Sequence, residues 1–250
     1  MNFEPKVAKM QDISKKDVWK MFDTISPSYD FLNRLLSFGL DVHWRNQLVK
    51  HIPKKSDIRL LDLATGTGDQ LITIIKKAPN VKTALGLDLA EDMLRLGQSK
   101  IIDKPYSHRV TLTTGDATSL NLNENSVDCV TMSFGIRNVS SVESTLKECR
   151  RVLTPYGKVM ILEFSLPKNK LIKAFHLFYL RYILPFVAGA ISRNLAAYKY
   201  LNKTIETFPC GDEFCELMLK EGFFNVKAYP LTLGIVTLYV GEKIPCGSNL

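Results

Sequence analysis

Cysteine is scarce in this chain of 250 residues, and its five cysteines include no Cys-x-x-Cys pair. Cys210 and Cys215 are separated by four residues, but no second pair matches them, so the usual ligand spacing of a zinc site is missing. The four histidines are scattered along the chain. These absences predict a reduced, cytosolic protein that uses neither a metal ion nor disulfide bonds.

Long hydrophobic runs are also missing. The N-terminal segment has no apolar core of the kind that marks a signal peptide. The most apolar window, Leu171–Ile191, is interrupted by Lys173, His176, Arg181 and Pro185, and so falls short of the ~20 apolar residues that a spanning helix needs. We expect a chain that does not cross a membrane, while attachment to a membrane surface is a separate question.

The composition contains no sign of disorder or of a repetitive fibre. Hydrophobic residues make up 46% and charged residues 23%, with 14 glycines and 11 prolines, as in an ordinary globular protein of one domain. The 33 Lys and Arg exceed the 25 Asp and Glu. This excess favours an anionic partner such as nucleic acid or a membrane surface, although many soluble enzymes have a similar balance.

Helical and β-rich segments follow one another along most of the chain. Apolar spacing predicts short helices over residues 14–51, broken at Ser26–Pro27, and we interpret residues 1–52 as a helical cap or lid. Residues 53–250 form the main domain, with a helical insertion at 167–208. The expected strands are Ile58–Leu63, Thr83–Asp88, Val110–Thr113, Val127–Ser133, Lys158–Phe164, Phe223–Tyr229 and Gly234–Val240. The expected helices between and after them are Gln70–Lys77 (capped by Asp69), Glu91–Lys100, Val142–Leu153 and Asp212–Glu221. The alternation predicts an α/β fold whose largely parallel sheet has helices on both faces.

A glycine loop, Ala64–Gly68, follows the first expected strand. Gly66-x-Gly68 alone is weak evidence for a nucleotide, because the third glycine of the dinucleotide fingerprint is replaced by Leu71 and no P-loop lysine follows. The loop therefore suits a nucleoside ligand without phosphates, of which S-adenosylmethionine (SAM) is one.

Acidic residues stand at the ends of three consecutive expected strands. Asp88, 20 residues after Gly68, is placed to accept hydrogen bonds from ribose hydroxyls. Asp116 is placed to meet an adenine amino group, with the backbone N–H of Ala117 beside it, and Asp62 can orient the glycine loop or meet the ammonium group of the ligand. Each acid could instead be a loop cap, but three together favour a SAM site.

The segment after the fourth strand reads Ser133-Phe134-Gly135-Ile136-Arg137-Asn138-Val139. It lacks the acid or Asn, two prolines and aromatic residue that base-amine methyltransferases commonly carry there, which lowers the nucleic-acid interpretation. With this segment, the chain resembles the quinone C-methyltransferases of menaquinone and ubiquinone biosynthesis (UbiE/MenG). The further matching stretches, which extend from about residue 18 to 243, are Met21–Asp23, Tyr29–Asn33, Leu60–Asp69, Gly115–Ala117, Arg151–Leu153, Ile161–Ser165 and Phe208–Pro209.

The resemblance implies a class I SAM-dependent methyltransferase with a Rossmann-like, seven-stranded sheet whose last strand is antiparallel. It implies SAM contacts at Thr67, Asp88, Asp116, Ala117 and Ser133. The acceptor would be a polyprenylated hydroquinone methylated on a ring carbon, namely demethylmenaquinol, a 2-polyprenyl-6-methoxy-1,4-benzoquinol, or both. Departures such as Thr154-Pro155-Tyr156-Gly157 in place of a Lys-Pro-Gly-Gly turn look peripheral to the chemistry.

A ring carbon is a poor nucleophile unless the neighbouring hydroxyl ionises, so the site needs a base or a cation. Arg137 is our candidate for a cation that lowers the pKa of that hydroxyl, although it could instead pair with a carboxylate. Asn138 could orient the ring oxygen. Tyr29 and Asp30, in the N-terminal segment, could close over the site as a lid.

The insertion is basic and aromatic. Residues 168–203 hold seven Lys or Arg and no Asp or Glu, interleaved with Phe175, Phe178, Tyr179, Tyr182 and Phe186. The segment is either a pair of core-packing helices with solvated lysines or an amphipathic cover that meets a prenyl tail and anionic headgroups at the cytoplasmic face of a membrane. The second interpretation is favoured, and a homodimer stays open.

Other functions remain alternatives. They are a SAM-dependent methyltransferase of another lipid or phenol, a SAM-binding or membrane-interaction protein without catalysis, and an RNA-binding protein. The last needs exposed aromatic and basic platforms, which the pattern of aromatic residues does not favour.

Overall fold

The structure is a computed structural model that describes residues 18–187 and 195–245. Its centre is a seven-stranded sheet in the order β3-β2-β1-β4-β5-β7-β6. Strands β1 to β5 run parallel, and β7 lies antiparallel between β5 and β6, which confirms the predicted fold class. The strands are β1 (Ile58–Leu63), β2 (Val81–Asp88), β3 (Val110–Thr114), β4 (Val127–Ser133), β5 (Leu153–Phe164), β6 (Phe223–Leu231) and β7 (Val236–Lys243).

Helices cover both faces of the sheet because each face carries apolar side chains. Helices α2 (Leu40–Val49) and α3 (Asp69–Lys77) pack Trp44, Leu48 and Ile74 into the core of one face. Helices α5 (Val142–Val152) and α9 (Asp212–Lys220) pack Leu146 and Phe214 into the other. Helix α4 (Glu91–Ile101) lies against β2 and β3. Thus α2, although within the predicted cap, is part of the wall of the main domain.

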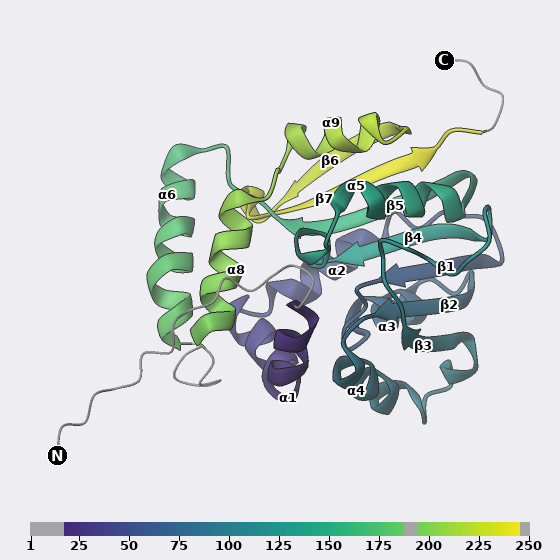
Figure 1. Ribbon diagram of the computed structural model, residues 1–250, viewed down its shortest axis with the longest axis horizontal. Coiled ribbons are helices and arrows are strands. Elements are labelled where there is room, and N and C mark those ends of the chain that lie inside the picture. The colour runs from purple at the N-terminus through teal and green to yellow at the C-terminus, as the bar shows by residue number, and fades with distance from the viewer. Residues whose placement is uncertain (1–17, 188–194, 246–250) are drawn as a thin grey trace.

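A third group of helices gathers beyond the carboxyl ends of the parallel strands. It comprises α1 (Val18–Leu36), α6 (Lys170–Phe178) with its π-helical extension η3 (Tyr179–Ile183), and α8 (Leu195–Thr207). Figure 1 shows them together on the side toward which β1 and β4 point. They share a separate apolar cluster around Leu32, Leu180 and Ile205. Ligands of open α/β sheets bind at this edge, so the group lies over the expected site.

Two local predictions were wrong. Helix α1 runs unbroken through Ser26 and Pro27, although an interior proline costs about 3 kcal/mol. Tertiary packing outweighs that cost, because α1 contacts both α2 and α4. Helix α3 is capped by Gly68 in the left-handed conformation, φ 78°, and not by Asp69, whose carboxylate pairs with Lys100 at 2.8 Å.

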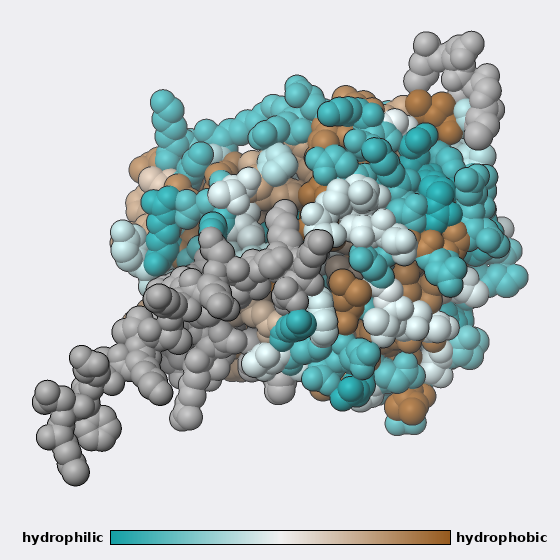
Figure 2. All heavy atoms as spheres, in the orientation of Figure 1, coloured by the Kyte–Doolittle hydropathy of each residue, from teal (hydrophilic) through white to brown (hydrophobic). Residues whose placement is uncertain are grey.

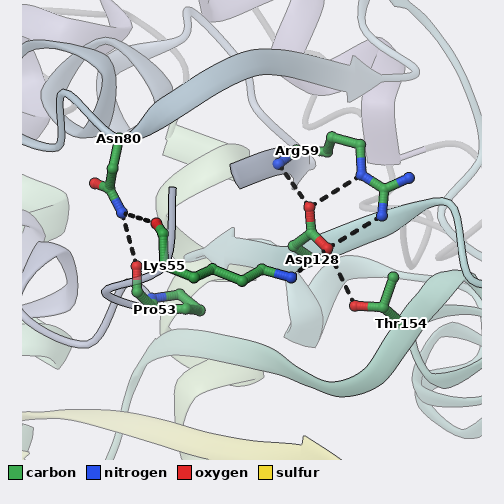
Figure 3. A network of polar contacts seen from close by, with 6 residues as sticks. All are labelled: Pro53, Lys55, Arg59, Asn80, Asp128 and Thr154. Atoms are coloured by element: carbon green, nitrogen blue, oxygen red, sulfur yellow. Dashed lines mark hydrogen bonds and ion pairs between the residues drawn. The ribbon is translucent and has the colours of Figure 1, made fainter. Parts of the chain in front are cut away.

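A buried acid at the opposite end of the sheet joins β4 to the segment before β1 (Figure 3). The carboxylate of Asp128 accepts hydrogen bonds from the Arg59 backbone and guanidinium, from Lys55 Nζ at 2.8 Å and from Thr154 Oγ1. Burial alone would raise the pKa of Asp128, but the bonds from Arg59 and Lys55 outweigh it and hold that pKa below its ordinary value. The cluster is structural, far from the carboxyl ends of the strands.

Hydrophobic side chains remain on the outside of α6 and η3. Phe175 is 68% exposed and Tyr182 65%, and Figure 2 shows hydrophobic and hydrophilic side chains mixed at this edge of the molecule. Within residues 18–187 and 195–245, no helix combines the length and hydropathy of a membrane span. Residues 188–194, in the predicted insertion, and 1–17, in the predicted cap, lie outside the described residues.

Candidate functional site

Two neighbouring cavities lie at the carboxyl edge of the sheet. The first, the strand-end cavity, has a volume of about 430 Å³ and is lined by the loops after β1, β2, β3 and β4. The second, the helical cavity, has a volume of about 340 Å³ and lies among α1, α2, α6 and α8. Phe22, Tyr29 and Phe134 line both. A molecule in one cavity therefore faces a molecule in the other across these three side chains.

The strand-end cavity collects most of the residues expected to bind SAM. Gly66, Asp88, Asp116, Ala117 and Ser133 all line it. Asp62, Thr67 and Gly68 do not line it: Asp62 lies near the end of β1, and Thr67 and Gly68 lie in the glycine loop. The sequence did not identify the apolar and aromatic residues that complete the wall, namely Trp19 of α1, Leu89 of the loop after β2 and Met93 of α4.

The glycine loop is held open by Asp88. Gly66 and Gly68 both have positive φ, 55° and 78°, which glycine adopts without strain. The Asp88 carboxylate accepts the Gly66 backbone N–H at 2.8 Å and that of Ala90 at 2.9 Å, so it orders the loops after β1 and β2 together. Burial raises the pKa of Asp88, against the effect of these backbone bonds. The cap interpretation therefore applies to Asp88, which also lines the cavity.

Asp62 acts from below the loop. Its side chain is buried and accepts hydrogen bonds of 2.6 Å from Thr65 Oγ1 and from Thr131 Oγ1 of β4. Burial raises its pKa to about 6, although both hydroxyls oppose the rise. Of the two roles expected for Asp62, this geometry favours orientation of the loop over contact with a ligand.

The other two strand ends present polar atoms to the cavity. Asp116 uses one carboxylate oxygen to accept the backbone N–H and the hydroxyl of Thr118, both at 2.8 Å. Ser133 donates to Gln70 Oε1 at 3.1 Å, and Gln70 is buried in α3. Each group thus has a fixed orientation before any ligand binds.

The charged side chains of the strand-end cavity limit which ligand groups can bind there. Asp88 and Asp116 are its charged side chains, and no lysine, arginine or histidine of the described part of the chain lines it. Phosphate groups would meet uncompensated negative charge here, whereas ribose hydroxyls, an adenine amino group and a sulfonium cation would not. The residues present therefore fit SAM and do not fit a dinucleotide.

The helical cavity is mainly aromatic and apolar. Phe134 and Phe164 pack with ring centroids 4.8 Å apart, and a guanidinium lies over each ring, Arg45 over Phe134 at 5.5 Å and Arg137 over Phe164 at 5.3 Å. Several polar atoms in this wall are buried and find no hydrogen-bond partner among the described residues, namely Arg45 Nε, Arg137 Nε, His176 Nε2 and Tyr200 Oη. Such atoms are costly in an apolar wall, which indicates a ligand with oxygen atoms of its own.

Arg137 is buried against a carboxylate. It is 5% exposed, and its Nη1 donates to Glu163 Oε1 at 2.6 Å and to the Phe134 carbonyl at 2.8 Å. The sequence left open whether Arg137 faces a ligand or pairs with an acid, and the structure shows the pairing. Asn138 donates weakly to the same carbonyl, at 3.4 Å, while its Oδ1 is buried without a partner and the residue lines the strand-end cavity.

Helix α1 is tied to the glycine loop by Asp30, which lines neither cavity. Its Oδ1 accepts the Thr67 hydroxyl at 2.6 Å and its Oδ2 pairs with Lys100 of α4 at 2.5 Å. Asp23, which lies earlier in α1, accepts the backbone N–H of Asp92 in α4 at 3.0 Å. Tyr29, next to Asp30, is thereby placed between the cavities. Burial raises the Tyr29 pKa, which Asn33, Arg45 and Arg137 oppose.

Sequence reasoning missed Glu163, Arg45, His176 and Tyr200. Glu163 has a sequence signal, because an acid inside the apolar strand run Lys158–Phe164 must find a buried partner. Arg45, His176 and Tyr200 have none, since they meet from three separate helices.

Comparison with known proteins places these features among methyltransferases. The profile of the ubiE/COQ5 methyltransferase family matches residues 10–243. The ubiquinone/menaquinone biosynthesis C-methyltransferase UbiE of Geotalea uraniireducens (strain Rf4) is 43% identical over 90% of this chain and 96% of its own. The demethylmenaquinone methyltransferase of Thermotoga maritima (strain ATCC 43589 / DSM 3109 / JCM 10099 / NBRC 100826 / MSB8) is 37% identical over 92% and 98%.

Solved structures confirm the fold at much lower identity. A SAM-dependent methyltransferase of Thermotoga maritima superposes with a TM-score of 0.62 at 19% identity, covering 90% of this chain and 99% of that one. A SAM-dependent methyltransferase of Methanococcus maripaludis superposes with a TM-score of 0.63 at 15% identity, covering 100% of both chains.

Proposed function

Since this chain belongs to the ubiE/COQ5 methyltransferase family, we propose that it transfers the methyl group of SAM to a ring carbon of a polyprenylated hydroquinone. The observation that carries the proposal is the pair of cavities with a shared wall. One is lined by carboxylates without cations, and the other is aromatic with unpartnered polar atoms. A nucleoside sulfonium suits the first, and a flat ring with oxygen substituents suits the second.

SAM supplies an electrophilic methyl group when it is bound. Gly66, Asp88, Asp116, Ala117 and Ser133 would hold it, with the ribose hydroxyls on Asp88 and the adenine on Asp116 and Ala117. Thr67 contributes by fixing the loop through its hydrogen bond to Asp30. Asp62 keeps the loop in place from below.

The helical cavity would hold the methyl acceptor. The acceptor ring carbon attacks the methyl carbon once the neighbouring hydroxyl has lost its proton, and the C–S bond of the donor breaks as the C–C bond forms. The ring carbon then loses its own hydrogen as a proton and one proton returns to oxygen, so that a single proton is released overall. Positioning of this kind can lower the activation barrier by about 7–11 kcal/mol.

Arg137, Asn138, Tyr29 and Asp30 have separate roles in this proposal. The Arg137–Glu163 pair fixes the turn Ile136–Asn138 and leaves Arg137 Nε to donate to a ring oxygen. Asn138 orients the ring from the strand-end side. Tyr29 forms the lid between the cavities, and Asp30 holds that lid closed.

A label-transfer assay tests the function. Purified protein in detergent receives radiolabelled SAM and either reduced demethylmenaquinone or a reduced polyprenyl-methoxybenzoquinone. We expect label on ring carbon of one quinol or of both, which also assigns the acceptor. If SAM binds by calorimetry and neither quinol becomes labelled, the enzyme acts on another lipid or phenol.

We also propose that the protein attaches to the cytoplasmic surface of a membrane through α6 and η3. Their outward face exposes large apolar side chains beside the mouth of the helical cavity, which would let a prenyl tail stay in the bilayer. Lys168 and Arg181 are paired with Asp212 and Glu206 from outside the basic run. Lys170 and Lys173, both on α6, have no ion-pair partner among the described residues and would meet anionic headgroups.

Sedimentation with liposomes containing anionic lipid tests this attachment. Lys170→Gln/Lys173→Gln should weaken binding by roughly fivefold per lysine and reduce its dependence on salt. Phe178→Ser/Tyr182→Ser should weaken binding at every salt concentration. Leu219→Ser, at an exposed apolar residue of α9, is the control and should bind as the wild type does. Equal binding by all variants contradicts attachment through this face.

A further inference from the structure

The charges around the helical cavity do not cancel. Glu163 neutralises Arg137 at 2.6 Å, and Arg34 neutralises Asp41 at 3.2 Å. Arg45 lines the same cavity and has no ion-pair partner among the residues that the structure describes. The wall therefore has one net positive charge, and Arg45 carries it.

Arg45 is also held where that charge matters. It projects from α2, next to the buried Trp44, and its guanidinium lies over the ring of Phe134, which lines both cavities. Its Nε is buried and finds no acceptor in the described protein. Burial raises the pKa of Tyr29, at the junction of the cavities, and of Asp62 below the glycine loop, and the charge of Arg45 opposes both rises. The field of Arg45 thus reaches the space between the two ligands.

We propose that Arg45 is the catalytic cation that stabilises the anionic form of the acceptor hydroquinone, with its Nε–H donating to the ring oxygen beside the methylated carbon. This inference rests on the proposed function and refines it. Arg137 cannot add net charge, because Glu163 balances it, and so its role is to donate a hydrogen bond and to hold the turn. The hydroxyl proton passes to solvent water as the oxyanion forms beside Arg45, which is already a cation and does not accept it.

The other groups that face this cavity do not supply the charge. Burial lowers the pKa of His176 and raises those of Tyr29, Tyr179 and Tyr200, so each of these groups is favoured in its neutral form. The titratable and charged groups around the cavity are Tyr29 on α1, Asp41 and Arg45 on α2, Arg137 before α5, His176 on α6, Tyr179 on η3 and Tyr200 on α8.

A spectroscopic titration tests Arg45 without requiring turnover. The probe is 2-geranyl-4-nitrophenol, whose absorbance changes on ionisation, bound together with S-adenosylhomocysteine. In the wild type the bound phenol should ionise at lower pH than the free phenol. Arg45→Met should move that midpoint upward by about 1–3 pH units, and Arg45→Lys should lie between the two. Lys50→Met, at an exposed cation just after the same helix, is the control and should match the wild type.

Activity provides the second readout. With a quinol acceptor, the pH at which kcat rises should move upward in Arg45→Met by about the same amount, with a smaller change in KM. If Arg45 had only a structural role, the variant would lose activity, but the pH at which kcat rises would stay the same. If Arg45→Met does not bind the probe, Arg45→Lys provides the test. Because lysine retains the positive charge, the bound phenol should still ionise at lower pH than the free phenol, and a midpoint at or above that of the free phenol contradicts the inference.

An ionisation midpoint that does not move in Arg45→Met overturns the inference. If S-adenosylhomocysteine binding is strongly weakened in the same variant, Arg45 belongs to the carboxylate of the donor instead. Failure of the proposed function is distinct, since it appears as an absence of label transfer in the wild type while the probe titration stays readable.

Discussion

Gly135 shows how closely the two halves of the site approach each other. A Cβ at this position would lie 2.5 Å from Ala64 Cβ, so the loop after β1 and the turn after β4 touch there without room for a methyl group. Ala64 and Phe134 both have positive φ, 47° and 60°, which costs energy for residues with a side chain. The surrounding packing therefore holds two strained residues at this tight contact beside the strand-end cavity.

Gly135→Ala should push these loops apart. We expect S-adenosylhomocysteine to bind about tenfold more weakly and the protein to lose roughly 1–3 kcal/mol of stability, as in other overpacked sites. Calorimetric titration and thermal melting measure the two effects. The double variant Gly135→Ala/Ala64→Gly removes the opposing methyl and should recover most of both losses. Failure of this rescue would show that the clash lies elsewhere, for example against Met132.

Among the elements, α1 is the one whose position was least predictable. The sheet and its helices follow from long periodic segments, and most of their bounds were predicted closely. Strand β5 is the exception, because it begins at Leu153, five residues before the expected Lys158. Proline in α1 indicated a break, but packing against α2 and α4 decided otherwise. The cavity that α1 closes with α2, α6 and α8 depends on which helices meet in space, and single-sequence patterns do not contain that information.

The closure of α1 depends on Asp30. Asp30→Asn keeps an oxygen for the Thr67 hydroxyl but loses the ion pair with Lys100. Because both side chains are partly exposed, we expect the lost ion pair to reduce the binding free energy of S-adenosylhomocysteine by only about 1 kcal/mol. The measured affinity should then fall severalfold. Lys100→Gln also loses the ion pair with Asp69 and should have a larger effect, and adding Asp30→Asn to Lys100→Gln should weaken binding little further. Fully additive losses in titration calorimetry would contradict a shared contact.

At the scale of the whole molecule, binding and stability are located at opposite ends of the sheet. Much of the lining of the strand-end cavity could be anticipated, because glycines and acids mark the strand ends. Arg137 lines the helical cavity, yet its pairing with Glu163 bridges 26 residues, and only a buried acid in an apolar strand hinted at it. The Asp128 cluster serves stability alone.

Asp128 therefore predicts a dependence of stability on pH. Its pKa in the folded protein is lowered, so its contribution is fully present above the ordinary pKa of about 4 and is lost as the pH falls below it. Asp128→Asn should cost about 1–3 kcal/mol at neutral pH, which is a fall in Tm of several degrees. The difference from wild type should shrink on acidification below about pH 4. A difference that stays constant with pH would contradict this origin.

The wall that both cavities share makes the two ligands thermodynamically dependent on each other. Phe22 and Tyr29 of α1 take part in both sites, so a ligand that orders α1 from one side prepares the surface met by the other. Linkage requires the effect to be reciprocal: by whatever factor the donor tightens the acceptor, the acceptor tightens the donor. The same coupling acts on the products, so demethylated donor retained in its cavity would slow the departure of the methylated quinol. Heterotropic cooperativity is thus built into a single helix.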